Sequence, residues 1–257
     1  MDAKESSQIL SALIMIAPLA EGNVTIILEG ETVSKPFVSM TLEMCKQFMG
    51  GNSVFSVTEN RYETKVSKAY SLGAENYQIE ADATAASYFL ALPIVTGGSC
   101  TVEGIHKDAL QGDVAFLEIL RKIGMLTDFS SNGAKTSRTE NLQGGRFCFN
   151  AISDTFLTLA AIAPLLEGPT TITGIGHTRK QETDRIMAMA NELRKLGQEV
   201  EETEDSLTIF PDIEKLRDNA KRRVKIDTYE DHRVAMSFGI LGSHDILENG
   251  EAWLSIR

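Results

Sequence analysis

The chain has 257 residues, of which 42% are hydrophobic and 24% are charged, with 20 glycines and 6 prolines. This composition is typical of a folded globular protein and excludes a low-complexity or disordered chain. The net charge of −11 gives no overall positive field that would attract nucleic acid or an anionic membrane, so an anion has to be bound by a local cluster of cations.

The ends of the sequence and its cysteines predict a cytoplasmic protein. Residues 1–6 lack the apolar core of a signal peptide, and the longest apolar stretch, Ile9–Ala20, is shorter than the roughly 20 residues that span a bilayer. Cys45, Cys100 and Cys148 are far apart and form no Cys-x-x-Cys pair, which excludes a disulfide framework and a thiolate zinc site. We therefore expect a reducing compartment and no membrane span.

A unit of about 73 residues is repeated along the chain. Two landmarks recur with this spacing: a proline near the end of an apolar run, and a glycine that ends an amphipathic segment. The prolines are 75 and 71 residues apart and the glycines 74 and 73 residues apart, at Pro18, Pro93 and Pro164 and at Gly50, Gly124 and Gly197. The repeat predicts several copies of one α/β supersecondary unit.

Each unit is expected to fold in the order apolar helix, strand, amphipathic helix, strand, strand. Apolar helices, each beginning at a Ser or Asp that favours the N-cap position, are predicted at 7–17, 82–93, 154–164 and 231–241. Strands after a glycine are predicted at Val24–Leu28, Cys100–Val102 and Thr170–Thr173. Amphipathic helices are predicted from the apolar stripes at Val38–Met49, Val114–Ile123 and Ile186–Leu196. Two closing strands are predicted in the third unit, at Gln198–Glu202 and Ser206–Phe210.

The first helix of each unit is apolar on every side, so we expect these helices to be buried on every side and roughly parallel, surrounded by sheets and amphipathic helices. Their N-termini, with free N–H groups and the positive end of the helix dipole, would then form an anion site. The chain holds three complete repeats and part of a fourth. We therefore expect it to be cut from a longer protein at both ends, and the helix at 7–17 to lack two of its neighbours.

Polar residues at the helix starts are the candidate functional residues. Ser6-Ser7-Gln8 and Ser34-Lys35-Pro36 are consistent with plain caps or, taken together, with a phosphate cradle. Asp154 is interpreted as the cap of the third apolar helix, and residues 177–185 contain six ionisable side chains. Asp231-His232-Arg233 places charge at the mouth of an apolar helix, where it is costly without a cleft or a partner, which favours a functional role. The four histidines never approach metal-ligand spacing, so no metal site is predicted.

Six segments, in this order and in register with the repeat, resemble those of the 5-enolpyruvylshikimate-3-phosphate (EPSP) synthase family. They are Ser6–Gln8, Ser34–Pro36, Asp82–Leu90, Gln111–Asp113, Glu182–Arg185 and Asp231–Met236. The resemblance covers essentially the whole chain. It implies the enolpyruvyl transferase fold, in which two domains of three βαβαββ units each surround parallel buried helices. Residues 1–79 would be the last repeat of the first domain, and residues 80–257 most of the second.

The reaction implied by the resemblance is transfer of the enolpyruvyl group of phosphoenolpyruvate to the 5-hydroxyl of shikimate 3-phosphate, with release of phosphate. Asp154 would accept the hydroxyl proton, and Glu182 would protonate the methylene carbon. Arg185 and Arg233 would bind phosphoenolpyruvate. Contacts to shikimate 3-phosphate and the second ligand would come from Ser6, Ser7, Gln8, Ser34, His177 and Gln181. No cofactor, nucleic acid or membrane partner is implied.

Three positions depart from the family pattern. Gln181 stands where many members have a lysine, His177 replaces an asparagine found in some members, and Phe37 stands where tyrosine is common. The resemblance also implies that cations contributed by an earlier part of the first domain and by a C-terminal tail lie outside this sequence. We therefore expect the 257-residue chain by itself to be inactive.

Two other functions stay open at this point. One is the enolpyruvyl transferase that acts on UDP-N-acetylglucosamine, which shares the fold; the Ser-Ser-Gln and Ser-Lys-Pro segments argue against it. The other is a non-catalytic module that binds a phosphorylated metabolite or a partner chain. Retention of Asp154, Glu182 and Arg185 argues against that reading for the parent protein.

Overall fold

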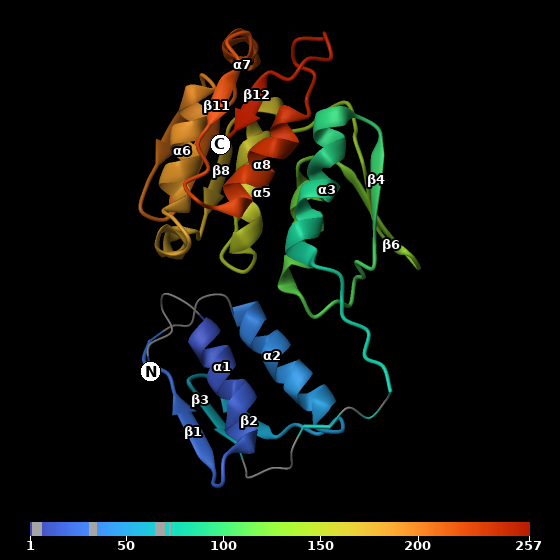
Figure 1. Ribbon diagram of the computed structural model, residues 1–257, viewed down its shortest axis with the longest axis vertical. Coiled ribbons are helices and arrows are strands. Elements are labelled where there is room, and N and C mark those ends of the chain that lie inside the picture. The colour runs from blue at the N-terminus through green and yellow to red at the C-terminus, as the bar shows by residue number, and fades with distance from the viewer. Residues whose placement is uncertain (2–6, 31–34, 65–69, 72, 74) are drawn as a thin grey trace. The chain divides into compact units, whose positions relative to one another are not determined.

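The computed structural model describes residues 1, 7–30, 35–64, 70, 71, 73 and 75–257. It divides into two compact units (Figure 1). Unit 1 comprises Met1–Glu80 and Leu110–Gly112, and unit 2 comprises Ala81–Ala109 and Asp113–Arg257. In the described ranges no helix is both long enough and apolar enough to span a bilayer.

Unit 1 is a three-stranded antiparallel sheet with two helices. Its elements are α1 (Gln8–Ile16), the 3-10 turn η1 (Ala17–Leu19), β1 (Val24–Ile27), α2 (Lys35–Phe48), β2 (Phe55–Thr58) and β3 (Arg61–Thr64). The strand order is β1-β3-β2, so the last strand pairs with both others. The helices and the sheet bury apolar side chains against each other, including Leu10 and Ile14 of α1, Val38 of α2 and Tyr62 of β3.

The first part of unit 2 has the same order of elements. It consists of α3 (Ala83–Thr96), β4 (Ser99–Glu103), the 3-10 turn η2 (Gly112–Ala115), α4 (Phe116–Lys122), β5 (Leu126–Ser130) and β6 (Gly133–Ser137). Its antiparallel sheet has the order β4-β6-β5. The helix α3 begins at Asp82, whose carboxylate accepts the Ala85 N–H at 2.9 Å, as an N-cap does.

The third copy forms a four-stranded sheet. Its elements are β7 (Arg146–Cys148), η3 (Ser153–Thr155), α5 (Phe156–Ile162), η4 (Ala163–Leu165), β8 (Thr170–Thr173), η5 (Gly176–Lys180), α6 (Arg185–Lys195), β9 (Glu199–Glu202) and β10 (Ser206–Phe210). The strand order is β7-β8-β10-β9, with β7 parallel to β8 and the other pairs antiparallel. The chain ends with α7 (Ile213–Ala220), β11 (Val224–Ile226), α8 (His232–Gly242) and β12 (Leu254–Ile256), in which β11 and β12 are parallel.

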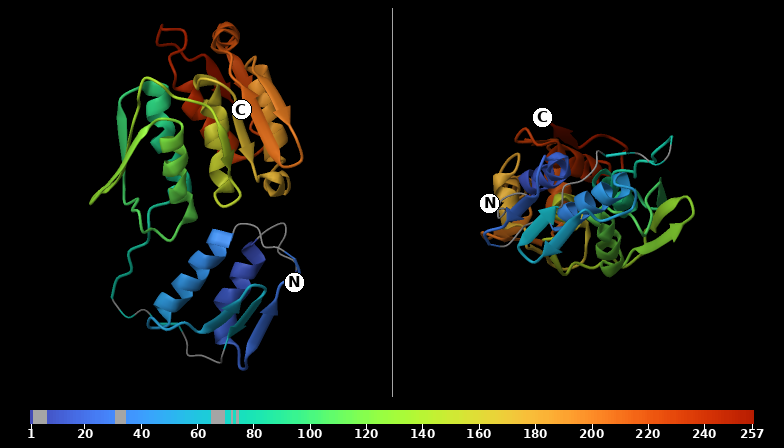
Figure 2. Two further views of the ribbon diagram at one scale, coloured as in Figure 1. Left: turned by 180° about the vertical axis from the view of Figure 1, so that it is seen from behind. Right: turned by 90° about the horizontal axis from the view of Figure 1, so that it is seen from below.

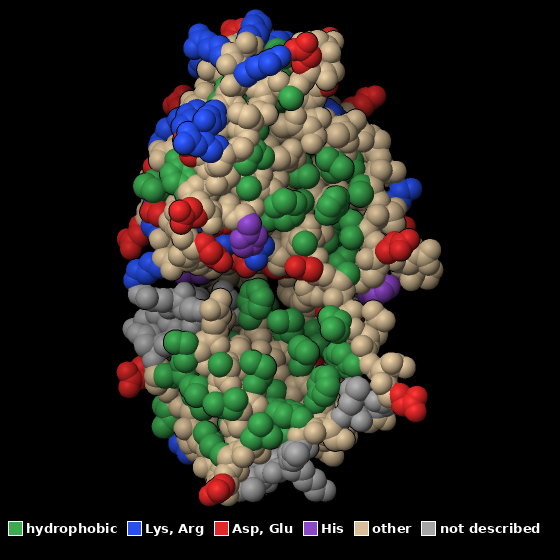
Figure 3. All heavy atoms as spheres, in the orientation of Figure 1, with side chains coloured by type: hydrophobic (Ala, Val, Ile, Leu, Met, Phe, Trp, Pro, Cys, Tyr) green, Lys and Arg blue, Asp and Glu red, His purple; other side chains and the backbone are tan. Residues whose placement is uncertain are grey.

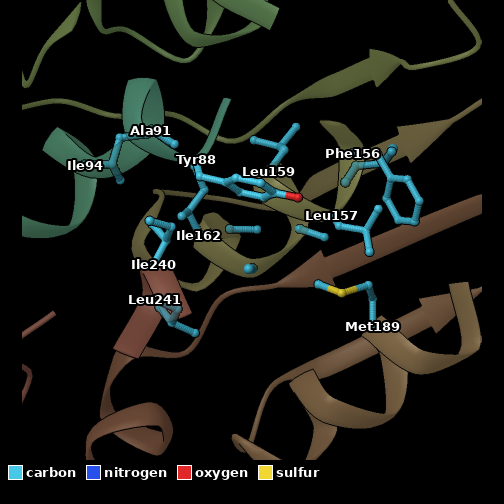
Figure 4. Close-up of a cluster of buried hydrophobic side chains, with 14 of the residues drawn as sticks. Tyr88, Ala91, Ile94, Phe156, Leu157, Leu159, Ile162, Met189, Ile240 and Leu241 are labelled. Atoms are coloured by element: carbon cyan, nitrogen blue, oxygen red, sulfur yellow. The ribbon is translucent and has the colours of Figure 1, made fainter. Parts of the chain in front are cut away.

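The core of unit 2 is formed by α3, α5 and α8, which lie side by side (Figure 1). From behind, Figure 2 shows these helices between the sheet of β4, β5 and β6 and the sheet that contains β8. All seven residues of α5 are buried. Figure 4 shows side chains of the three helices and of α6 pointing toward one another, among them Tyr88, Leu159, Met189 and Ile240. A hydrogen bond of 3.0 Å between the Ser87 and Thr158 hydroxyls satisfies two polar groups inside this apolar core.

The predicted repeat is confirmed, because the order helix, strand, helix, strand, strand occurs three times and α8 opens a fourth copy. The predicted strands agree with β1, β4 and β8. The prediction that every apolar helix is buried on all sides holds for α5 and is wrong for the other three helices. On α3 Phe89 is 48% exposed, and on α8 Met236 is 43% exposed. The departure is largest for α1. On α1 the buried side chains are those of Leu10 and Ile14, whereas Ile16 is 59% exposed.

The start of the third apolar helix also differs from the prediction. Residues 153–155 form the 3-10 turn η3, and α5 begins only at Phe156 after an N-cap residue, Thr155, whose side chain makes no capping bond. Asp154 therefore does not cap this helix. Both of its carboxylate oxygens accept hydrogen bonds from arginines instead, as described below.

Candidate active site

The N-terminal ends of α5, α6 and α8 bring ionisable side chains together in unit 2. Arg185, the first residue of α6, lies at the centre and is 1% exposed. Its Nε donates to Asp231 Oδ2 at 2.7 Å, its Nη1 donates to Asp154 Oδ1 at 3.0 Å, and its Nη2 lies 2.6 Å from Glu182 Oε2. Nη1 also donates to the Gln181 side-chain oxygen. One guanidinium thus connects three carboxylates from different parts of the chain.

Asp154 links two guanidiniums. Oδ1 accepts from Arg185, and Oδ2 accepts from Arg233 Nη2 at 3.0 Å. The side chain is 18% exposed, so the carboxylate is held in place but still reaches solvent. A carboxylate fixed in this way between two cations can accept a proton from a hydroxyl group placed beside it, which is the chemistry of a general base.

Asp231 serves as the N-cap of α8. Its Oδ1 accepts the Arg233 N–H at 2.8 Å while Oδ2 accepts Arg185 Nε, and the side chain is completely buried. A buried carboxylate needs such partners because an unpaired charge in the interior is costly. The charged trio at 231–233 is therefore built into the helix start, with Arg233 facing Asp154.

The pKa of the Arg233 guanidinium is raised above its ordinary value. Burial acts to lower it, but the negative charge of Asp154 and the neighbouring Tyr88 hydroxyl outweigh this effect. Burial also raises the pKa of Tyr88, with the positive charge of Arg233 acting in the opposite direction. Arg233 consequently remains a cation next to a phenol that stays protonated at neutral pH.

A fourth carboxyl group, that of Asp113, lies in the same cluster. The Thr84 hydroxyl donates to its Oδ2, while Oδ1 is buried without a hydrogen-bond partner among the described residues. Burial raises the pKa of Asp113 to about 6; the Thr84 bond opposes this rise, and the negative charges of Asp154 and Asp82 add to it. The sequence marked Asp113 only within the Gln111–Asp113 segment, because nothing local indicates that it is buried.

His177 and the preceding turn complete this side of the cluster. His177 Nε2 lies 2.9 Å from the Ser153 hydroxyl. Burial lowers the pKa of His177, although the charges of Asp154 and Asp205 oppose the shift, so the imidazole is neutral at pH 7. Sequence reasoning missed Ser153, which precedes Asp154 and hydrogen-bonds to His177.

The charged residues of segment 177–185 have two roles: some stabilise the fold, and others belong to the charged cluster. Arg179 pairs with Asp184 at 2.7 Å and donates to the Thr203 carbonyl at 2.6 Å. Asp184 in turn caps α6, since its carboxylate accepts the Met187 N–H at 3.0 Å. Glu182 differs from these residues because its side chain is 51% exposed, so its carboxyl group can exchange protons with solvent.

The remaining predicted residues belong to unit 1. Ser7 is buried at the N-cap position of α1, where its carbonyl accepts the Ser11 N–H at 2.9 Å and its hydroxyl makes no capping bond. The plain-cap reading of this serine is therefore wrong for its side chain. Gln8 is the exposed first residue of α1. Ser6 and Ser34 lie outside the described residues.

The balance of charge limits what this cluster binds unaided. Arg185 and Arg233 supply two positive charges, against the carboxylates of Asp154, Glu182 and Asp231 and the titrating group of Asp113. An anion that approaches the two guanidiniums has to compete with these carboxylates. Among the described residues no group of three or more potential ligands is placed to hold a metal ion.

Known proteins resemble this chain along nearly its whole length. A model of the family described as "EPSP synthase (3-phosphoshikimate 1-carboxyvinyltransferase)" matches residues 1–249. A protein of Opitutus terrae named 3-phosphoshikimate 1-carboxyvinyltransferase is 45% identical over 265 residues, covering 100% of this chain and 55% of the relative. A relative of the same name from a Sulfurovum species is 42% identical, covering 94% of this chain and 54% of the relative. The chain spans about half the length of these relatives.

Solved structures confirm the fold class. An EPSP synthase from Acinetobacter baumannii superposes with a TM-score of 0.71 and 23% identity, over 95% of this chain and 56% of that chain. An enolpyruvyl transferase from Streptomyces tendae superposes with a TM-score of 0.62 and 15% identity, over 94% and 52% of the two chains. At these identities the likeness establishes the α/β architecture of repeated units.

Proposed function

Since this chain belongs to the EPSP synthase family, we propose that it takes part in transferring the enolpyruvyl group of phosphoenolpyruvate to the 5-hydroxyl of shikimate 3-phosphate, with release of phosphate. The observation that carries this proposal is the Asp154 carboxylate held between Arg185 and Arg233 at the helix starts. A base and two anion-binding groups stand together there, as the reaction requires.

The addition step makes one C–O bond and moves two protons. The 5-hydroxyl oxygen attacks C2 of phosphoenolpyruvate while its proton passes to Asp154, and Glu182 gives a proton to the methylene carbon. Exposure of Glu182 supports this role, because the group can be recharged from solvent. In the second step the C–O bond to phosphate breaks and phosphate leaves with the proton that Asp154 had accepted. The new methyl group returns a proton to the Glu182 carboxylate, and the double bond is restored.

The guanidiniums and polar side chains bind the substrates in this proposal. Arg185 and Arg233 bind phosphoenolpyruvate, and their positive charges stabilise the charge that develops on the leaving phosphate. The phosphate of shikimate 3-phosphate is assigned to the serines, and the other contacts to glutamine and histidine side chains: Ser6, Ser7, Gln8, Ser34, His177 and Gln181. A neutral His177 donates or accepts a hydrogen bond without adding charge.

Residues 1–79 correspond in this proposal to the last repeat of the first domain of a two-domain enzyme, and residues 80–257 to most of its second domain. Because the relatives are about twice as long, the cations that offset the carboxylates around Arg185 are expected in the parts of the relatives that this chain does not span. The 257-residue chain alone should therefore show no measurable turnover. The enzyme is assigned to the cytoplasm.

The test is a turnover assay on a protein of full family length that contains this chain, with phosphoenolpyruvate and either shikimate 3-phosphate or UDP-N-acetylglucosamine as acceptor. Phosphate release is expected when shikimate 3-phosphate is the acceptor and not when UDP-N-acetylglucosamine is. Release only with the UDP-sugar would assign the chain to the other transferase. No release with either acceptor, combined with thermal stabilisation by shikimate 3-phosphate, would support a non-catalytic binding module.

A further inference from the structure

The turn that leads into α8 has an uncommon backbone. Two successive residues, Tyr229 and Glu230, have φ angles of +55° and +61°, in the left-handed region. Neither is glycine or asparagine, the residues that enter this region at least cost, so the surrounding contacts have to hold the turn in place. The turn closes where the Asp231 N–H donates to the Thr228 carbonyl at 2.9 Å.

A buried carboxylate on α6 holds this turn from one side. The Tyr229 hydroxyl donates to Glu192 Oε1 at 2.7 Å, and the Asp227 N–H donates to Glu192 Oε2 at 3.2 Å. The Glu192 side chain has no exposed surface, and Lys195 pairs with the same Oε1 at 2.8 Å. Burial and the bond to Glu192 raise the pKa of Tyr229, so its hydroxyl keeps the proton that it donates.

The same helix carries Arg185. Residues 185 and 192 are seven positions apart on α6, almost two full turns, so their side chains leave the same face of the helix. Arg185 Nε bonds to Asp231 Oδ2 at 2.7 Å. Helix α6 therefore contacts the segment 227–231 at two points: Glu192 bonds to Tyr229, and Arg185 bonds to Asp231.

The direction of Asp231 depends on this turn. Only two residues, Tyr229 and Glu230, separate Thr228 from Asp231, and both are in the left-handed conformation. If they relaxed to a right-handed or extended conformation, the Asp231 carboxylate would move away from Arg185 Nε and from the Arg233 N–H, both of which it now binds. The Arg185 guanidinium would then lose one of its carboxylate partners, and the start of α8, which carries Arg233, would lose its cap.

We propose that Tyr229 and Glu192 are positioning residues of this site: their hydrogen bond holds the left-handed turn that places Asp231 between the Arg185 guanidinium and the Arg233 backbone N–H. The turn thereby sets the direction of the Arg185 guanidinium and fixes the first turn of α8, which carries Arg233. This positioning role does not depend on which reaction the protein catalyses. The effect that we expect on phosphoenolpyruvate binding rests on the proposed function.

The first experiment follows the Arg185 Nε–Hε signal by ¹⁵N NMR of the labelled 257-residue chain, assigned by its loss in Arg185→Lys. In the wild type this proton is buried against Asp231 and should exchange slowly with water. In Tyr229→Phe, which keeps the ring and removes the hydroxyl, exchange of Hε should accelerate by about tenfold or more, as expected for a lost hydrogen bond. Backbone amides in the middle of α5 should keep their rates. Tyr77→Phe, which removes a hydroxyl bonded to Gln47, is the matched control and should leave the signal unchanged.

Two further variants test the cause. Glu192→Gln combined with Tyr229→Phe should accelerate Hε exchange no more than the larger single change, because the two residues form one bond. Glu230→Asn introduces a residue that tolerates the left-handed conformation and should restore most of the slow exchange in Tyr229→Phe. An unchanged Hε rate in Tyr229→Phe, equal acceleration of the α5 amides, additive effects in the double variant or no rescue by Glu230→Asn would each overturn the proposal.

The enzymatic readout uses the protein of full family length. Tyr229→Phe should raise the KM for phosphoenolpyruvate about tenfold or more while leaving the KM for shikimate 3-phosphate near the wild-type value. An equal change of both KM values would overturn the assignment of this bond to the guanidiniums. Failure of the proposed function would appear as absence of turnover in the wild type, and the Arg185 exchange test would still decide the positioning role.

Discussion

Helices α1 and α5 hold the same place in the repeat but lie in different surroundings. Ile16 on α1 and Ile162 on α5 each stand two residues before the proline that ends the apolar run, and they are 59% and 0% exposed. The helices α3 and α8 cover α5 inside unit 2, whereas α1 packs on α2 and the sheet of unit 1. An apolar sequence thus allows a helix to be buried on every side, and the number of neighbouring repeats decides how much of its surface is buried.

The outer side of α1 forms part of an apolar surface on unit 1. Figure 3 shows hydrophobic side chains gathered on the visible face of this unit. Those exposed on α1 and η1 are Ile9, Met15, Ile16 and Leu19, and a shallow groove is lined by Leu13, Ile16, Ala17, Leu19, Ala20 and Val24. Exposed apolar surface of this kind marks a place where unit 1 gains stability from any covering element.

The largest expected effect is a loss of turnover when Asp154, at the start of α5, is replaced; replacing a capping aspartate on another helix should cause no such loss. In a protein of full family length, Asp154→Asn should lower kcat by a factor on the order of 10² to 10⁴, because the amide keeps the shape but cannot accept the proton. Asp212→Asn is the matched control: Asp212 caps α7 by accepting the Lys215 N–H at 2.9 Å, and asparagine caps equally well. Steady-state phosphate release measures both. A wild-type rate in Asp154→Asn would leave this residue as an ion-pair partner only.

The second prediction tests the difference in burial between α5 and α1. Ile162→Ala should lower the free energy of unfolding of unit 2 by about 2 to 5 kcal/mol, since it leaves a cavity in a fully packed site, and Ile16→Ala should change that of unit 1 by less than about 1 kcal/mol. Urea dependence of hydrogen exchange, read from peptides over α5 and α1, follows each unit separately. Equal losses would mean that α1 is covered in solution by something that buries Ile16.

The third prediction concerns pH and unit 2. Because the folded-state pKa of Asp113 is raised to about 6, the folded protein binds this proton more tightly than the unfolded chain does. The resulting stability is fully present below the unfolded pKa near 4 and is lost as the pH rises to about 6, by up to about 3 kcal/mol. Denaturation of unit 2 between pH 4 and 8 should show this slope, and Asp113→Asn should abolish it. A slope that survives in Asp113→Asn would assign the titration to another group.

The smallest expected effect lies on the apolar face of unit 1. Ile9→Gln replaces a side chain that is 65% exposed, so the free energy of unfolding should stay within about 0.5 kcal/mol of the wild type. Fluorescence of an apolar dye bound to the chain should fall. Leu10→Gln, one position along on the buried side, should unfold unit 1 and raise dye fluorescence. A loss of stability in Ile9→Gln similar to that in Leu10→Gln would contradict the exposure of this face.

Local patterns predicted much of the fold. The 73-residue spacing and the apolar runs located the helices and strands of three units, because helix and strand periods are properties of neighbouring residues. The resemblance to a family then selected Asp154, Glu182, Arg185 and Arg233, which the structure places in one cluster. The cap assigned to Asp154 was wrong because an arginine far along the chain competes for the same oxygens.

By itself the sequence determined the repeat, the order of elements and the residues that carry charge at each helix start. Only the tertiary structure decided which of these charges meet. Arg185 pairs with Asp231, 46 residues away, and Asp154 with Arg233, 79 residues away, while Asp113 lies buried beside them. The left-handed turn at Tyr229 and Glu230 likewise has no local signal, since neither residue favours that conformation. Contacts of this kind form because packing of α3, α5, α6 and α8 brings the helix starts together, and no pattern of neighbouring residues contains that information.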